Sequence, residues 1–271
     1  MPTVLGVDGC PRGWCAVQLD TDTRALTSSH HDTFRNVLST FPRITIAIDV
    51  PIGLMEGPGG RECDREARKY LGRPRASSVF PPPVRQILRL TGIKGKYGEA
   101  CHESRSATGG KAISQQSFWI GPKIREVDDV MTRALERRIY EAHPEVSFAA
   151  MNSSQIRTNV GAQRLRATPT SRRESAAPAN PPQRDSRHAM RYRKGTRQGR
   201  AERWPVLRRT FSDLPKTPVL PDELRRLCDL EDYIDALACA WTAARIATGV
   251  ADSMPQDTPR DSRGLRMVIW R

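Results

Sequence analysis

Apolar residues in the first 50 positions follow the patterns of short strands, with one helix between them. Residues 3–8 (TVLGVD) and 14–20 (WCAVQLD) predict two strands joined by a Gly/Pro turn, and a weaker pattern over 24–31 predicts a third antiparallel strand. Apolar positions at helical spacing predict a helix over 32–41. The β-branched run ITIAIDV, 44–50, is typical of a strand buried on both faces.

The remainder of the chain has mainly helical patterns. Segment 138–151 predicts a short strand, a turn with proline and a helix, and 264–270 predicts a closing strand. The Gly- and Lys-rich stretch 92–117 predicts a mobile or functional loop. Helices are expected at 61–72, 122–136 (with proline in its first turn), 199–211 and 230–249. A strand hairpin followed by a parallel-type crossover predicts an α/β fold, with a mixed sheet and helices packed on it.

One segment interrupts this pattern. Residues 155 to about 189 contain Pro, Ser, Ala and Arg with hardly a large apolar residue. Such a segment buries too little surface to offset its ordering entropy, so we expect disorder or an irregular insertion. The overlapping stretch 160–209 holds 14 basic side chains against three acidic ones, which leaves +11 of the total net charge of +14. A local excess of this size favours a polyanionic partner, with nucleic acid as the natural hypothesis.

Composition restricts the cellular setting. No apolar run approaches the roughly 20 residues that a membrane helix needs, and the first residues lead directly into a strand pattern. We therefore expect a cytoplasmic protein with no membrane partner. The six cysteines form no C-x-x-C pair, which favours reduced, structural thiols.

Two aspartates each end an apolar strand. Asp8 ends the first strand, and Asp49 ends the buried strand at 44–50. Functional residues in α/β sheets gather at the carboxyl ends of neighbouring strands, so adjacent parallel strands would place these carboxylates side by side. For each aspartate alone, a turn residue that makes a hydrogen bond to its own backbone is the favoured interpretation. The two together favour a functional site.

A second pair of aspartates lies near the start of the long C-terminal helix. Asp232 and Asp235 are three positions apart and share one helical face. Asp232 also suits the helix dipole, whereas Asp235 stands among apolar neighbours. Clustered carboxylates require a cation, and oxygen ligands suit Mg²⁺ or Mn²⁺. Two such ions at Asp8, Asp49, Asp235 and Asp232 would support phosphodiester hydrolysis.

Several stretches together resemble one family. In chain order they are GVDGCPRGW, IAIDVPIGL, RECDREAR, SSVFPPPVR, PKIREVD, YEAHPEVSF and DYIDALACAWTA. They resemble the domain-of-unknown-function family 429, whose members are regarded as predicted nucleases of RNase H-like fold. The resemblance implies one RNase H-like domain over 1–271, with a mixed sheet of three antiparallel strands plus parallel strands and helices on both faces. The poorly fitting stretch at about 155–190 would interrupt this domain.

The resemblance also implies roles for particular residues. Asp8, Asp49 and the Asp232/Asp235 pair fit the places of the acidic catalytic and metal-binding residues, with Mg²⁺ or Mn²⁺ as cofactor. The HPE stretch adds His143 and Glu145 as catalytic candidates. His143 suits a general base, a phosphate contact or a residue that caps the following helix.

Basic residues supply candidate contacts to nucleic acid, whether DNA or RNA. The family's Lys-rich stretch is similar to RKGTRQGRAER, 193–203, which contains Lys194, Arg200 and Arg203. Arg12, in the turn beside Asp8, completes this set. The IREVD stretch contributes Glu126 and Asp128, for which the resemblance implies no definite chemistry.

Three functions fit these observations. The first is a metal-dependent nuclease with an RNase H/RuvC-like two-metal mechanism. The second is a non-catalytic nucleic-acid-binding protein that acts through its Arg-rich tract. The third is an ATP-dependent phosphotransferase, because sugar kinases share the fold's core. A P-loop is missing, since ATGGKAIS lacks the GK[ST] ending, which disfavours the third function.

Overall fold

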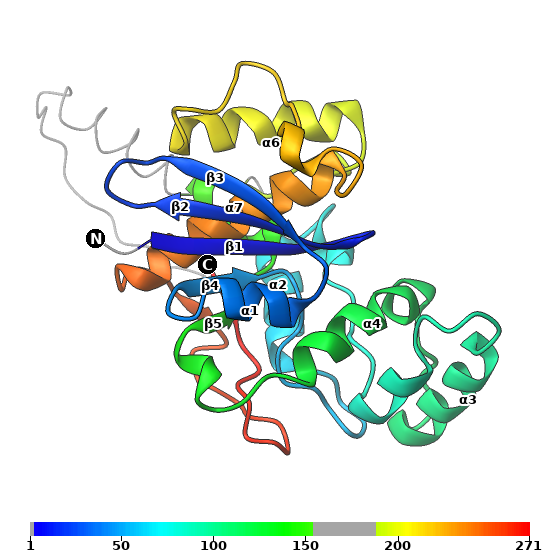
Figure 1. Cartoon of the computed structure of the whole chain (residues 1–271). Helices are drawn as coiled ribbons and strands as arrows, with labels where there is room; N and C mark the ends of the chain where they lie inside the picture. The colour runs from blue at the N-terminus through cyan, green and yellow to red at the C-terminus, as the bar shows by residue number, and fades with distance from the viewer. Residues whose placement is uncertain (1–2, 154–187) are drawn as a thin grey trace, which may run out of the picture.

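Five strands form one mixed sheet in the computed structural model, which describes residues 3–153 and 188–271 (Figure 1). The strand order is β3-β2-β1-β4-β5. β1 pairs antiparallel with β2, and β2 with β3, whereas β1, β4 and β5 are parallel. These strands span Thr3–Cys10 (β1), Gly13–Asp20 (β2), Leu26–His31 (β3), Thr45–Ile48 (β4) and Ile139–Glu141 (β5). The predicted α/β fold with a mixed sheet is confirmed. Of the segment from 155 to about 189 that is predicted to be disordered, residues 155–187 lie outside the described residues, and Ala189 is buried.

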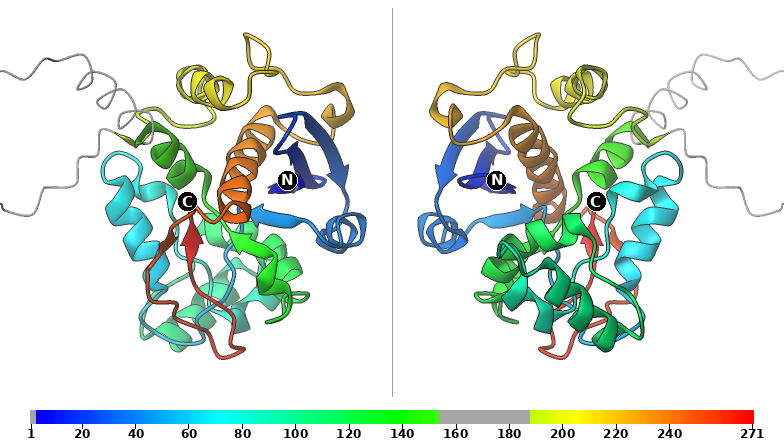
Figure 2. Two further views of the ribbon diagram at one scale, coloured as in Figure 1. Left: turned by 90° about the vertical axis from the view of Figure 1, so that its left-hand side faces the viewer. Right: turned by 90° about the vertical axis from the view of Figure 1, so that its right-hand side faces the viewer.

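Alternation along the strands gives the sheet two buried faces. Val4 and Val17 belong to the core on the side of α6 and α7. Leu5 and Ile46 belong to the core on the side of α1 and α4. Figures 1 and 2 show α7 and α1 on opposite sides of the sheet. These helices span Phe34–Thr40 (α1), Gln115–Asp128 (α4), Arg197–Thr210 (α6) and Leu230–Ala247 (α7). The period-two pattern therefore explains how both faces of the sheet are covered.

Gly6 lets α7 lie directly against β1. A Cβ atom at Gly6 would stand 2.1 Å from both the carbonyl oxygen of Ala236 and the amide nitrogen of Ala240. Because both facing residues of α7 are alanines, the helix backbone meets the strand backbone without a layer of side chains between them. This contact fixes where the first turns of α7 lie relative to the carboxyl end of β1.

The prediction of a loop at 92–117 is wrong. Within it α3 spans Tyr97–Thr108, and α4 begins at Gln115 behind Ser114, whose side chain accepts a hydrogen bond from the amide of Ser117. The few apolar residues of this stretch pack into a separate small core with Val84 and Ile87. A sparse apolar stripe that covers a small satellite core gives only a weak helical signal.

The helix predicted at 122–136 is displaced. Pro122 lies inside α4, not in its first turn, and the helix ends at Asp128. Ser114 caps the helix and determines its start, and Pro122 removes one backbone hydrogen bond within it.

The other helices confirm the sequence pattern. α2 spans Glu62–Leu71, and residues 144–153 are helical after β5. Short 3-10 turns occupy the connections Ala76–Ser78 (η1), Arg85–Leu90 (η2), Leu135–Arg137 (η3) and Asp222–Leu224 (η5).

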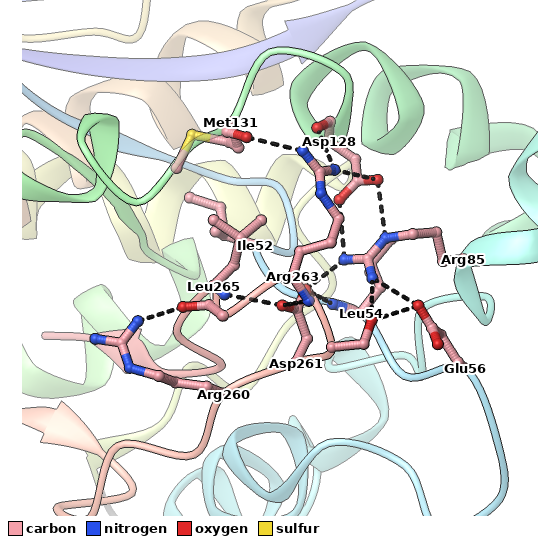
Figure 3. Close-up of polar contacts among 12 residues, drawn as sticks. Ile52, Leu54, Glu56, Arg85, Asp128, Met131, Arg260, Asp261, Arg263 and Leu265 are labelled. Atoms are coloured by element: carbon pink, nitrogen blue, oxygen red, sulfur yellow. Dashed lines mark hydrogen bonds and ion pairs between the residues drawn. The ribbon is translucent and has the colours of Figure 1, made fainter.

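The predicted closing strand at 264–270 is mostly irregular. Only Ile269–Trp270 (β7) is a strand, and it pairs antiparallel with Ser253–Met254 (β6) in a separate two-stranded sheet. Ion pairs hold the segment that precedes it (Figure 3). Arg85 contacts Asp128, with its Nε 3.0 Å from Oδ2, and it also contacts Asp261. Asp261 accepts a hydrogen bond from the amide of Leu54, so the C-terminal segment anchors the chain that leaves β4.

Two further expectations concern membranes and thiols. Among the described residues, no helix is both long enough and apolar enough to cross a membrane. All six cysteines are buried and unpaired, as the lack of paired spacing predicted.

Candidate carboxylate site

The two strand-end aspartates lie next to each other. β1 and β4 are neighbours in parallel register, with Val7 opposite Ile48. The amide of Asp49 donates to the carbonyl oxygen of Val7 at 3.0 Å, which continues the ladder by one residue. Asp8 and Asp49 therefore lie side by side, as the strand pattern predicted. Asp8 does not end its strand, however, because β1 continues to Cys10 through its pairing with β2.

A third aspartate comes from α7. Asp235 is 1% exposed, and its helix is held against β1 at Gly6. Asp8, Asp49 and Asp235 each offer a carboxylate oxygen, and these atoms lie within 4.8 Å of one another. We call these three residues the carboxylate cluster. Three segments that are remote in sequence thus bring one type of ligand to one point.

Burial and mutual repulsion disfavour the charged form of this cluster. Loss of solvent, followed by the charges of Asp49 and Asp235, holds the pKa of Asp8 well above its usual value. Burial raises the pKa of Asp49 to about 6, against the opposing effect of His143 and Lys194. A cation placed among the three carboxylates would relieve both effects.

Lys194 already supplies one positive charge. Its Nζ lies 2.5 Å from Oδ2 of Asp235, although 52% of the lysine side chain remains exposed. The charge of Asp235 is the main cause that holds the pKa of Lys194 well above its usual value. The ammonium group thus stays protonated beside the cluster at neutral pH.

Asp232 is placed differently from the other predicted ligands. Its Oδ2 accepts a hydrogen bond from the amide of Asp229 at 2.8 Å, which completes a capping box at the start of α7. Burial raises its pKa to about 6. It lines the same cavity as Asp8 and Asp49, but it is not one of the three mutually close carboxylates. The hydrogen bond of Asp232 thus agrees with a role at the start of the helix, the alternative to a metal-ligand role that the sequence left open.

Two cavities meet at the cluster. The acid cavity, about 260 Å³, is lined by Asp8, Asp49, Asp64, Asp232 and Glu141 among others. The basic cavity, about 390 Å³, is lined by Arg75, Arg193, Ser77 and Ser78, and also by the acids Glu145 and Asp235. Asp49, His143 and Lys194 line both cavities. A molecule in the basic cavity therefore meets hydrogen-bond donors and carboxylates together.

His143 faces both cavities from the turn between β5 and the helix at 144–153. Its Nε2 lies 3.4 Å from the carbonyl oxygen of Ser78, so Nε2 carries the hydrogen in the neutral tautomer that this contact selects. Nδ1 is buried and has no hydrogen-bond partner among the described residues. The ring therefore keeps one nitrogen available as a proton acceptor.

Glu145 and Arg203 form a buried pair behind this histidine. Nη2 of Arg203 lies 2.5 Å from Oε1 of Glu145, and the arginine is 1% exposed. Arg75 approaches the same carboxylate at 3.8 Å. Arg203 therefore stabilises Glu145 inside the fold, and its burial argues against the predicted contact with nucleic acid. Glu145 lies outside the carboxylate cluster but lines the basic cavity.

The remaining predicted contacts lie at the surface. Arg200 pairs with Glu231 at the start of α7. Arg12 is exposed in the β1–β2 turn, and its carbonyl oxygen contacts Nε2 of His30 at 3.2 Å. Lys194 remains the basic residue that lies nearest to the predicted chemistry, since it contacts the carboxylate cluster directly.

Both acids of the IREVD stretch are structural. Glu126 accepts hydrogen bonds from Nε1 of Trp14 at 3.1 Å and from the amide of Phe34 at 2.5 Å, which secures the start of α1. Asp128 pairs with Arg85 and Arg263, each at 3.0 Å (Figure 3). Neither side chain reaches the carboxylate cluster.

A second cluster of potential metal ligands was not predicted from the sequence. Cys63, Asp64 and Glu141 also place ligand atoms within 4.8 Å of one another. The guanidinium group of Arg61 already fills this place, with Nη2 2.5 Å from Oε2 of Glu141 and 2.9 Å from Sγ of Cys63. Glu141 is the last residue of β5, and Asp49 directly follows β4, so its strand-end position was the signal that could have located Glu141.

The donor set of the carboxylate cluster fits a hard divalent cation. All three groups are oxygen donors, which Mg²⁺ and Mn²⁺ prefer, and the residual negative charge beside Lys194 favours a cation over a neutral ligand. The Arg61 group differs, because a guanidinium cation occupies it and one of its donors is a thiol. We therefore consider only the Asp8/Asp49/Asp235 group as a metal site.

Removing the partly buried charge of Asp49 is expected to change how stability depends on pH. A carboxyl group with a pKa of about 6 in the folded protein, against its ordinary value of 3.8, binds its proton more tightly when folded. The metal-free protein should therefore lose stability as pH rises from about 4 to about 6. For Asp49 the loss in the free energy of unfolding should be about 1–3 kcal/mol. The lower end of this range allows for screening by solvent. Urea unfolding in EDTA, at four pH values from 4.5 to 7.5, would measure it.

Asp49→Asn should flatten this part of the pH profile. Lys194 is protonated throughout the range and does not contribute to the slope. Parallel profiles of Asp49→Asn and the unmodified protein would contradict the expectation.

The fold and the site together define a class: an α/β protein with three carboxylates gathered beside the carboxyl ends of two parallel strands. A family model described as "Protein of unknown function (DUF429)" matches residues 6–188 and 182–260. The chain therefore belongs to the DUF429 family. No curated protein and no solved structure matches the chain.

Proposed function

We propose that this protein is a metal-dependent nuclease of RNase H-like fold that hydrolyses phosphodiester bonds. The observation that carries the proposal is the convergence of Asp8, Asp49 and Asp235 within 4.8 Å at one edge of the sheet. Asp8 and Asp49 both have raised pKa values, and a buried group of acids perturbed in this way is characteristic of functional sites.

The arrangement of the strands supports the proposed fold. Three antiparallel strands followed by parallel β4 and β5, with the last long helix across β1, agree with what the family resemblance implies. In this arrangement the first strand, the fourth strand and the final helix each contribute one acid. The proposal therefore rests on where the acids lie as well as on how many there are.

Each residue of the site would have a separate role in hydrolysis. Asp8, Asp49 and Asp235 would hold the divalent ion, which supplies charge stabilisation and lowers the pKa of a nearby water. His143 lies between the two cavities with Nδ1 free, so it can take up a proton within the site. The Arg203–Glu145 pair holds the turn after His143 in place from behind.

The basic cavity suits the backbone of a nucleic acid. Arg75, Arg193 and the hydroxyl groups of Ser77 and Ser78 line it. Such donors position phosphates without reading bases, which is how most protein–nucleic-acid hydrogen bonds act. The site thereby joins a surface that accepts phosphate to a group of carboxylates that can hold a metal ion.

Cleavage assays test this proposal. Labelled single-stranded, duplex, branched and hybrid substrates would be incubated with protein in EDTA, Mg²⁺ or Mn²⁺. We expect cleavage that requires the metal and that falls about 10³-fold in Asp235→Asn, with substrate binding largely retained. Asp22→Asn is the matched control, because Asp22 lies in the turn after β2, at the opposite end of β1 from Asp8.

The outcomes separate the candidate functions. Binding without cleavage on every substrate and metal would contradict the nuclease and favour a non-catalytic nucleic-acid-binding protein. Metal-dependent ATP turnover without cleavage would favour a phosphotransferase. Equal loss of activity in Asp22→Asn would show that the effect of Asp235→Asn is not specific to the site.

A further inference from the structure

Lys194 lies where a cation is needed. Its Nζ is 2.5 Å from Oδ2 of Asp235. Asp235 is 1% exposed and belongs to the carboxylate cluster with Asp8 and Asp49. The lysine side chain is half exposed and lines both the acid cavity and the basic cavity. The ammonium group thus reaches the carboxylates from the solvent side, along the path that a substrate would take.

We propose that Lys194 holds the place of a second cation, so that the carboxylate cluster binds one divalent ion and not two. This inference rests on the proposed function and refines it. It also replaces the two-ion arrangement expected from the family resemblance.

Charge supports a single ion. The three carboxylates carry −3 when ionised, and Lys194 reduces this to −2, which one divalent ion neutralises. A second divalent ion would leave an excess of +2 among groups that are mostly buried. Paired catalytic ions stand about 3.5–4 Å apart, so the second ion would also have to displace the ammonium group from Asp235.

The ligands also support a single ion. Asp232 is the carboxylate that a second ion would need, but its Oδ2 is held by the amide of Asp229. Turning Asp232 toward a metal would remove one of the two hydrogen bonds of the capping box at the start of α7. Three carboxylates, one of which also pairs with Lys194, provide enough protein ligands for one octahedral ion that keeps several water ligands.

Lys194 would then act on the substrate as well as on the acids. An ammonium group beside the carboxylates and open to the basic cavity can donate a hydrogen bond to a phosphate oxygen. In this arrangement the lysine carries the charge that a second ion would bring, and it remains in place when the metal is removed.

The experiment counts bound Mn²⁺. Protein freed of metal with EDTA and then dialysed would be titrated with Mn²⁺ by calorimetry, and electron paramagnetic resonance would report whether bound ions are isolated or spin-coupled. The variants are Lys194→Gln, which removes the charge, and Lys194→Arg, which keeps it. Both should fold, because the side chain is half exposed.

We expect one isolated Mn²⁺ in the unmodified protein and in Lys194→Arg, and two ions in Lys194→Gln. Cleavage should fall at least tenfold in Lys194→Gln and less in Lys194→Arg. Two spin-coupled ions in the unmodified protein, or a single ion in Lys194→Gln, would overturn the role of Lys194 and leave the metal site standing. No Mn²⁺ binding at millimolar concentration would overturn both this inference and the proposed function.

Discussion

Asp8→Asn is expected to make the metal-free protein more stable while it abolishes metal-dependent cleavage. Asp8 is 7% exposed, and burial together with Asp49 and Asp235 disfavours its charge. An amide of the same shape removes that repulsion and keeps an oxygen that can accept the hydrogen bond from the amide of Gly9. The gain should be about 1 kcal/mol in EDTA, and the loss of cleavage about 10³-fold.

Thermal unfolding with and without metal would measure both effects of Asp8→Asn. The melting temperature should rise in EDTA, and the additional stabilisation by millimolar Mg²⁺ or Mn²⁺ should disappear. Asp22→Asn, in the distant turn after β2, should change neither quantity. A lower melting temperature in EDTA for Asp8→Asn would indicate that its charge stabilises the fold, which would contradict the strain inferred at the cluster.

Gly6→Ala is expected to cause a large loss of stability. The new Cβ would stand 2.1 Å from two backbone atoms of α7, and neither backbone atom can rotate away. The helix would have to move off β1 by more than an ångström, which separates Asp235 from Asp8. We expect a loss of about 3 kcal/mol or more, with little soluble protein at elevated temperature.

Gly98→Ala is the matched control for this change. Gly98 lies in α3, and a Cβ there meets no atom within 4 Å. Alanine at this position should be neutral or stabilise the protein by up to about 1 kcal/mol. Urea unfolding of both variants would measure the difference. Equal stability of Gly6→Ala and Gly98→Ala would show that α7 does not depend on close contact with β1.

The central part of the site was predictable because its signals are local. Asp8 and Asp49 each close an apolar run of the sequence, and Asp235 is flanked by apolar residues in a long helix, so each can be placed by its immediate neighbours. The parallel register of β1 and β4 then brings the first two together. Asp232 carried two local signals at once, and only the hydrogen bond with Asp229 distinguishes the helix cap from the ligand.

Other parts depend on partners that a local pattern does not contain. Arg203 stands in a basic run that is typical of a solvated surface, yet it is buried because Glu145, 58 positions away, pairs with it. Arg61 is buried for the same reason, through Glu141. α3 was missed because its apolar residues cover only a small satellite core. Pairing across the fold, not residue type, determines each of these positions.

The contact between Gly6 and α7 also has a kinetic consequence. The hairpin of β1 and β2 joins neighbouring segments and can close early, whereas α7 comes from the far end of the chain. Contacts between distant segments form late because loop closure must precede them. During synthesis Asp8 and Asp49 are therefore exposed for a long time before Asp235 arrives. A nascent or truncated chain would hold an incomplete set of ligands, so hydrolytic activity should begin only after the whole domain has folded.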